Sequence, residues 1–474
     1  MLPMQALLVS TYELGHQPFG LASPAAWLRR EGVDVRCVDA SKERLGDAAI
    51  HSADLIAFHL PMHTATRLAA PLIQRARRLN GSARLCAYGL YAPLNADWLR
   101  SLGVSDVLGG EFEEALSSIV RALGRPRQSA GCEAVEERPA PDETRAQPIP
   151  RLQFLVPDRS GLPPLSRYAG LQIGDGSTIV AGHTEASRGC RHLCRHCPIV
   201  PVYNGQFRVI QSDVVLADVA AQVAAGARHI TFGDPDFFNG PSHALRIMEA
   251  FAAAHPGVSY DVTIKVEHLL QHRALIPRLR DTGCLFVTSA VESLDDAVLA
   301  ILQKGHTRAD FLEVVALCRA DRLTLVPTFV PFHPWTTLAG YCDLLDTLEA
   351  LDLVDHVSPI QLAIRLLIPE GSRMLEVAEV GSMVLPFDPR TLAYPWKHAE
   401  PAVDRLHADV TSLVGGKLAS DRGAVFEAIS QLAHERAGVE RRSVAGARAA
   451  RIVPYLNEPW YCCAEPNPDQ LRMV

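Results

Sequence analysis

The most constraining feature of the sequence is a short loop with three cysteines, Cys190, Cys194 and Cys197, at CxxxCxxC spacing. In a chain without a secretory signal, thiols this close together are more plausibly gathered by a metal than oxidised. Three thiolates are one ligand short of a closed four-cysteine site, so a bound ion or cluster would keep an open coordination position. An open position is typical of catalytic sites rather than structural ones.

A structural zinc knuckle is the alternative interpretation of this loop. His192 or His196 would then supply the fourth ligand, because imidazole binds zinc well. Zinc knuckles usually present two separated pairs of ligands rather than one group of three. The spacing therefore favours an iron–sulfur cluster, and a zinc- or metalloid-binding protein without catalytic activity is the rival.

Composition and charge narrow the class of protein. The chain has 474 residues, of which 48% are hydrophobic and 21% charged, as is typical of a globular protein of several domains. Its formal net charge of −7 provides no basic surface for nucleic acid. The N-terminal stretch lacks the basic region of a signal peptide, and no apolar run is long enough to span a bilayer. We expect a cytoplasmic protein that binds neither nucleic acid nor membrane.

Strands alternate with helices in the first 124 residues. We expect five strands, at residues 5–10, 33–38, 54–58, 84–88 and 104–108, and helices at 21–30, 64–78 and 113–123. This alternation predicts crossover connections and a parallel, doubly wound sheet, which binds ligands at the carboxyl ends of its strands.

The rest of the chain divides into a linker, a second α/β domain and a tail. Residues 125–160 form a polar, proline-rich linker. Residues 161–385 resume the alternation, with strands expected at 228–232, 259–264, 284–290, 323–330 and 356–364. Residues 386–474 add two helices, near 402–413 and 424–435, and the adjacent pair Cys462-Cys463.

The remaining cysteines fall into three groups. Cys37, Cys86, Cys284, Cys318 and Cys342 lie singly in apolar surroundings, where a buried free thiol is the default, and Cys132 lies in the linker. A disulfide between Cys462 and Cys463 would be strained, because consecutive Cα atoms lie only about 3.8 Å apart. This leaves a soft-ligand clamp, a redox dithiol or two ordinary cysteines.

The three-cysteine loop resembles that of the radical S-adenosylmethionine (SAM) enzymes, in which it holds a [4Fe–4S] cluster whose fourth iron chelates SAM. The resemblance implies a partial (β/α)₆ barrel with its chemistry at the carboxyl ends of the strands. The first domain is similar to the Rossmann-like, cobalamin-binding domain of one branch of these enzymes, with Gly89 and residues 109–116 as the closest matches. The DxHxxG stretch of many cobalamin proteins is missing, so both cobalamin binding and a vestigial domain remain open.

Several site residues follow from this resemblance. Gly233 and Asp234 occupy the place of the family's "GGE" motif, which receives the SAM ammonium group. The segment 289–293 is similar to its "GxES" stretch, so Ser289, Glu292 and Ser293 would bind the ribose hydroxyls or the methionyl carboxylate. His196 replaces the usual aromatic residue before the last cysteine and could lie against the adenine. The guanidinium of Arg208 could bind a carboxylate.

The C-terminal ending Cys462-Cys463-Ala-Glu-Pro466 resembles a radical SAM group named for a CUAEP or CCAEP tail. By that analogy the two cysteines act at the active site, where soft ligands suit a thiophilic small molecule such as trivalent arsenic. The reaction would then be transfer of the aminocarboxypropyl group of SAM, with flavodoxin or ferredoxin as electron donor. A cobalamin-dependent radical SAM methyltransferase is the alternative enzyme.

Overall fold

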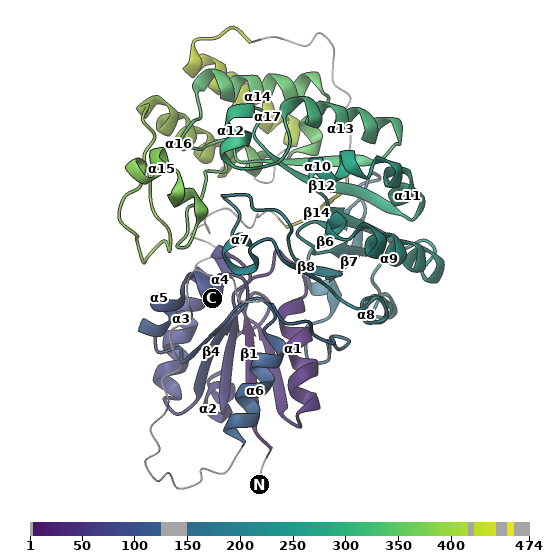
Figure 1. Ribbon diagram of the computed structural model, residues 1–474, viewed down its shortest axis with the longest axis vertical. Helices are drawn as coiled ribbons and strands as arrows, with labels where there is room; N and C mark the ends of the chain where they lie inside the picture. Colours follow the sequence, from purple (N-terminus) through teal and green to yellow (C-terminus); the bar gives the residue numbers. More distant parts are fainter. Residues whose placement is uncertain (1–2, 125–148, 416–420, 442–452, 459–474) are drawn as a thin grey trace.

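The structure is a computed structural model that describes residues 3–124, 149–415, 421–441 and 453–458. It shows an N-terminal α/β domain beneath a larger α/β domain, with the cysteine loop between them (Figure 1). No helix within the described residues is both long enough and apolar enough to cross a membrane. The predicted linker lies mostly outside the described residues, as does Cys132.

The N-terminal domain is a doubly wound sheet of five parallel strands. Their order is β2-β1-β3-β4-β5, from β1 (Gln5–Ser10), β2 (Asp34–Asp39), β3 (Leu55–His59), β4 (Arg84–Tyr88) and β5 (Asp106–Leu108). Helices α1 (Phe19–Arg30) and α6 (Glu113–Leu123) contact each other, as do α2 (Asp47–Ser52) and α3 (His63–Leu79). Two short helices, α4 (Tyr91–Leu94) and α5 (Ala96–Ser101), connect β4 to β5.

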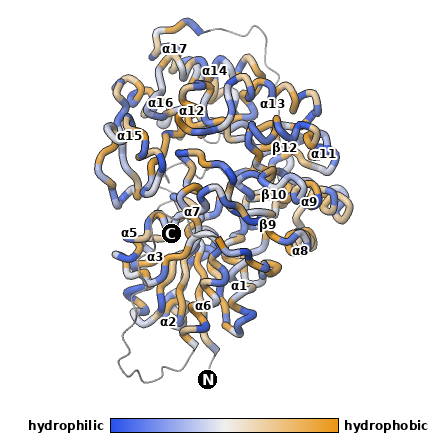
Figure 2. Tube along the Cα trace, in the orientation of Figure 1, coloured by the Kyte–Doolittle hydropathy of each residue, from blue (hydrophilic) through white to orange (hydrophobic). Residues whose placement is uncertain are grey.

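The alternation of side chains along the buried strands gives this domain two cores. On β1, Leu7 and Val9 pack with residues of α2 and α3, whereas Ala6 and Leu8 pack with residues of α1 and α6. Successive residues of a strand point to opposite faces, so a continuous apolar run fills both sides of the sheet. Figure 2 shows the hydrophobic residues gathered in the interior of this domain.

The second domain is a curled sheet with five parallel strands. These are β7 (Thr178–Thr184), β10 (His229–Phe232), β11 (Ser259–Thr263), β12 (Cys284–Glu292) and β13 (Thr324–Phe329). Two antiparallel strands, β6 (Gly170–Gln172) and β14 (Tyr455–Leu456), extend the sheet beyond β7. The helices that follow the strands are α8 (Ser212–Ala224), α9 (Pro241–Ala254), α10 (Val266–Gln271), α11 (Ile276–Asp281), α12 (Asp296–Ile301), α13 (Arg308–Ala320) and α14 (Leu338–Ala350).

One predicted strand of this domain is wrong. Residues 356–364 form two 3₁₀ turns, Val354–His356 and Pro359–Ala363, instead of a strand. The apolar side chains Val357 and Leu362 are nevertheless buried in the core of this domain. A buried turn therefore produced the same apolar pattern as a buried strand. Beyond β13, a single parallel bridge between Phe332 and Arg365 continues the pairing within the part of the chain that the structure describes.

The C-terminal residues pack against both domains. Helices α15 (Ala378–Met383), α16 (Pro401–Gly415) and α17 (Arg422–Ala437) follow the barrel, and α17 packs against α14 and α16. The chain then returns as β14 and pairs with β6, and the carboxylate of Glu458 accepts a hydrogen bond of 2.9 Å from the hydroxyl of Tyr12. The five isolated cysteines are buried free thiols, as predicted.

Candidate active site at the mouth of the barrel

The cysteine loop is held by a short antiparallel hairpin of β8 (Ser187–Gly189) and β9 (Phe207–Val209). Gly189 has a φ of +76°, and a Cβ there would lie 2.4 Å from the carbonyl oxygen of Gln206. Only glycine therefore fits directly before the first cysteine. The amide of Cys190 donates to that same carbonyl at 3.1 Å, which sets the start of the loop.

The three cysteines lie in a buried, positively charged environment. Cys190 and Cys194 are buried and Cys197 is half-buried. Lys265 Nζ lies 3.8 Å from Cys194 Sγ, and the nearly buried Lys304 is a second cation beside the thiols. Burial, with Cys194 close by, raises the pKa of Cys197 to about 12. The thiol of Cys197 therefore ionises at neutral pH only with a metal, and the two lysines can offset the negative charge of bound thiolates.

Asp234 holds the strand that leads into the loop. One carboxylate oxygen accepts from the amide of Ala186 at 2.9 Å, and the other accepts from the hydroxyl of Ser187 at 2.5 Å. Burial raises the pKa of this carboxyl group to about 7. At Gly233, a Cβ would lie 2.3 Å from Nε2 of His183, so the backbone passes directly against that ring. Both residues lie where β10 ends.

Glu292 connects the loop to the end of β12. Its Oε1 lies 3.1 Å from Nε2 of His196 and 3.4 Å from Nζ of Lys304. Burial opposes ionisation, but Lys304 and His196 outweigh it and lower the pKa of Glu292 to about 2. Its φ of +71° follows a bulge in the pairing of β12 with β13, which points its side chain toward the loop.

The other predicted residues lie at different distances from this group. Ser289 is fully buried on β12, and its Oγ has no hydrogen-bond partner among the described residues. The hydroxyl of Ser293 accepts from the amide of Asp295. Arg208 on β9 donates to the carbonyl oxygens of Ile149, Pro150 and Phe207. Cys462 and Cys463 lie outside the described residues.

A buried ion-pair group joins the two domains beside the loop. The guanidinium of Arg188, on β8, lies 2.7 Å from Glu113 and 3.2 Å from Glu111 of the N-terminal domain, and 2.6 Å from Glu185. Burial and the neighbouring carboxylates, partly offset by Arg188, raise the pKa of Glu111 to about 7. Three carboxyl groups thus share one cation, and Glu111 takes up a proton near neutral pH.

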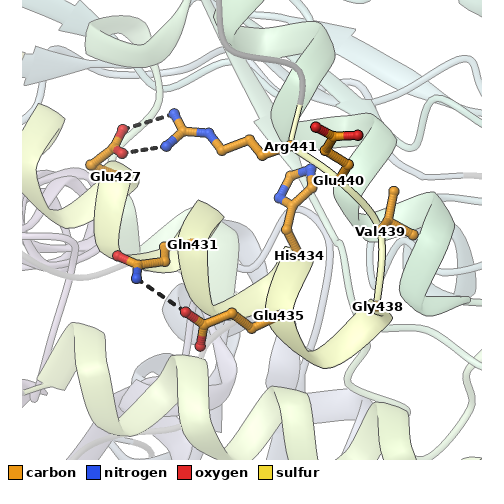
Figure 3. Close-up of a pocket in the computed structure, with 8 residues that line it drawn as sticks. All are labelled: Glu427, Gln431, His434, Glu435, Gly438, Val439, Glu440 and Arg441. Carbon is orange, nitrogen blue, oxygen red and sulfur yellow. Dashed lines mark hydrogen bonds and ion pairs between the residues drawn. The ribbon is translucent and has the colours of Figure 1, made fainter.

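Lys265 was not identified from the sequence. It lies two residues after β11 and is the residue before α10, and a lysine shortly after a buried strand was the signal that could have found it. A pocket lies elsewhere, at the end of α17, where Arg441 forks onto Glu427 and Gln431 donates to Glu435 (Figure 3). These are ordinary surface contacts, far from the cysteine loop (Figure 1).

Residues 184–345 match the family model of the radical SAM superfamily. Among curated proteins, the chain is similar to tRNA-2-methylthio-N(6)-dimethylallyladenosine synthases. The one from Chlorobaculum tepidum is 28% identical over 204 residues, 40% of this chain and 43% of that protein. The one from Chlorobium phaeobacteroides is 23% identical over 286 residues, which are 57% of this chain and 58% of that protein. The chain thus spans less than two thirds of the length of these relatives.

Solved structures share both domains. The radical SAM methyltransferase TsrM from Kitasatospora setae, with tryptophan and a SAM analogue bound, superposes with a TM-score of 0.61 at 18% identity, covering 79% of this chain and 76% of that chain. The cobalamin-dependent SAM radical enzyme OxsB, with aqua-cobalamin and SAM bound, superposes with a TM-score of 0.66 at 14% identity. The match covers 87% of this chain and 67% of that chain. The likeness confirms the predicted fold class: a doubly wound domain followed by a partial barrel.

Proposed function

We propose that this chain, which carries a radical SAM domain, is an enzyme that cleaves SAM reductively and uses the radical to modify a small molecule. The radical SAM family uses a [4Fe–4S] cluster and SAM, which confirms the predicted enzyme class and these two cofactors. Cys190, Cys194 and Cys197 would hold the cluster. The observation that carries the proposal is that one loop at the carboxyl ends of parallel strands holds two buried thiols and one half-buried thiol, with Lys265 beside them.

When bound, the cluster supplies the electron that splits the sulfonium C–S bond of SAM. The protein's own residues position and desolvate the cofactors. Lys265 and Lys304 offset negative charge at the thiolates, and Glu292 fixes His196 and Lys304 on one side of the loop. The hydroxyl of Ser289, which has no hydrogen-bond partner among the described residues, is available to a hydroxyl or carboxylate of SAM. A reductant such as flavodoxin or ferredoxin would supply the electron.

The direct test is turnover with the reconstituted, chemically reduced protein. We expect iron and sulfide in equal amounts and formation of 5′-deoxyadenosine or methylthioadenosine from SAM. The single variants Cys190→Ala, Cys194→Ala and Cys197→Ala should lose both the cluster and the product, whereas Cys342→Ala should retain both. A protein that binds stoichiometric zinc in place of iron and leaves SAM intact would overturn the proposal in favour of the zinc-binding alternative.

Corrinoid binding by the N-terminal domain is a second candidate, favoured by the two-domain likeness to OxsB. The carboxyl ends of its strands are compatible with such a ligand. A Cβ at Gly110 would meet no atom within 4 Å, and the buried Oγ of Ser10, at the end of β1, has no partner among the described residues. Reconstitution with hydroxocobalamin, followed by desalting and an absorption spectrum, tests it. A spectrum without corrinoid bands would overturn it.

The substrate proposal concerns Cys462 and Cys463. We place them as ligands of a thiophilic substrate, with trivalent arsenic and aminocarboxypropyl transfer as the specific reaction. What supports this is the C-terminal sequence and the fixed position of Glu458, four residues ahead, against Tyr12 after β1. Methylthioadenosine formed only with arsenite is the expected result. A Cys462→Ala/Cys463→Ala variant that turns over as the wild type does would overturn it.

A further inference from the structure

Three metal-ligating side chains converge beside the cysteine loop without belonging to the cysteine trio. His192 lies in the loop, Asp236 lies just after β10, and His268 lies on α10, after β11. Asp236 Oδ2 is 2.7 Å from His268 Nδ1 and 3.7 Å from His192 Nε2, and the three atoms all lie within 4.8 Å of one another. Each comes from a strand end at the mouth of the barrel.

These three atoms are buried and poorly satisfied. The exposed fraction of the side chain is 0% for Asp236, 6% for His268 and 16% for His192. Among the described residues, none of the three atoms makes a well-directed hydrogen bond. The ion pairs that join Asp236 Oδ2 to the two imidazoles lack hydrogen-bond geometry. A buried polar atom without a hydrogen bond costs roughly 1–3 kcal/mol, so three that face one point are suited to holding an ion.

Neighbouring residues hold these three side chains in place, as the residues behind the ligands do in metal sites. The amide of Phe238 donates to Oδ1 of Asp236 at 3.1 Å, so that Oδ2 faces the two histidines. Glu267 Oε2 lies 3.5 Å from Nδ1 of His192, on the far side of the ring from Asp236, and 3.5 Å from Nζ of Lys265. A carboxylate behind a histidine fixes the ring and its tautomer in many metal sites.

We propose that His192, Asp236 and His268 form a mononuclear site for a divalent first-row transition ion, zinc or ferrous iron, separate from the cluster. Two imidazoles and one carboxylate match these ions rather than Mg²⁺ or Ca²⁺, which prefer oxygen ligands. Bonds of about 2.0–2.2 Å to one ion place its ligand atoms about 3–4 Å apart, which the observed separations approach. Three protein ligands leave coordination positions open to a heteroatom of the substrate.

The test measures metal content in the full-length, cluster-loaded protein, in which the cluster occupies the cysteines. Equilibrium dialysis against Zn²⁺, followed by elemental analysis, should give one zinc per chain besides the cluster iron. His268→Ala and Asp236→Asn should lose that zinc and keep the iron. His272→Ala, one helical turn beyond His268, is the matched control and should keep both metals. Glu267→Gln should weaken zinc binding about 10–100-fold.

A second measurement, on protein without the cluster, tests the site if the variants of the cluster-loaded protein fail to fold. The full chain with all three loop cysteines changed to serine should bind one Co²⁺, with ligand-field bands of nitrogen and oxygen ligands and without thiolate charge-transfer absorption. Adding His268→Ala should abolish these bands. The proposal is overturned if the loaded protein takes up no zinc, if His268→Ala retains as much zinc as His272→Ala, or if the serine variant gives no cobalt bands. Because no readout is turnover, failure of SAM cleavage would not affect the result.

Discussion

At the scale of single residues, the site is dominated by buried cations. An unpaired buried charge is costly, so each lysine beside the loop lies near an acid: Lys265 near Glu267, and Lys304 near Glu292. Each lysine also lies beside the cysteines. This arrangement suits an anionic cluster, whose charge grows more negative when it accepts an electron. The sequence could not reveal it, because lysine is ordinarily a surface residue and only packing brings Lys265 to Cys194.

We expect Lys265→Met to lower the reduction potential of the cluster, because removing a positive charge disfavours the reduced state. At an effective dielectric constant near 20, the loss should exceed about 1.4 kcal/mol, which is about 59 mV for one electron. A redox titration followed by electron paramagnetic resonance measures it. Lys397→Met, at an exposed position, serves as the control. Equal potentials in the two variants would contradict a role for Lys265 in tuning the cluster.

Glu292→Gln should destabilise the folded chain by about 3–5 kcal/mol, because it leaves Lys304 buried without its carboxylate. The pKa of Glu292 is depressed to about 2, so its contribution is present above the ordinary carboxyl pKa and is lost as the pH falls toward 2. Urea unfolding at pH 7 measures the change, with the exposed Glu313→Gln as control. A loss no larger than that of the control would refute the pairing.

At the scale of elements, the short strand β8 is what places the cysteine loop, and Asp234 is what places β8. We expect Asp234→Asn to lower the cluster content after reconstitution while the chain stays folded. An asparagine in the same position can turn only one acceptor toward the two donors, which leaves one of them unsatisfied at a cost of about 1–3 kcal/mol. Iron analysis with circular dichroism measures both quantities. Asp281→Asn, which alters an exposed ion pair, should retain full iron.

The strands and helices with clear periodicity were predicted well from the sequence. The strand at Gln5–Ser10 and the helix at Glu113–Leu123 have the predicted bounds. The strand predicted at 356–364 is wrong because the apolar residues there are buried in turns, and burial alone does not distinguish a turn from a strand. Short strands such as β8 and β9 carry no periodic signal, since three residues are too few to show one.

At the scale of the whole molecule, the two domains are joined by side chains beside the cysteine loop. Arg188 reaches Glu111 and Glu113 across the boundary, and His16 stacks on His183 with ring centres 4.5 Å apart. None of these partners could be paired from the sequence, because the residues lie more than 70 positions apart and no local pattern connects them. The consequence is that the geometry of the loop depends on the N-terminal domain.

Glu111 makes the stability of this junction depend on pH. Its pKa rises from 4.5 to about 7 on folding, so the folded chain binds the extra proton and stability falls as the pH rises through that window, by about 3 kcal/mol. Glu111→Gln should flatten this part of the profile and raise stability at pH 8. Thermal unfolding between pH 5 and 8 measures it, with Glu114→Gln on the surface of α6 as control. An unchanged slope would contradict the assignment.

Strand β14 closes the outer edge of the larger sheet, and its neighbour Asn457 bonds Gly170, 287 positions earlier in the chain. Pairing two segments so far apart in the sequence costs much conformational entropy. A strand of only two residues makes few hydrogen bonds to offset that cost. The pairing of β14 with β6 should therefore be among the last contacts to form during refolding, and its amide protons among the first to exchange. We expect residues 455–457 to separate from β6 while the rest of the chain stays folded.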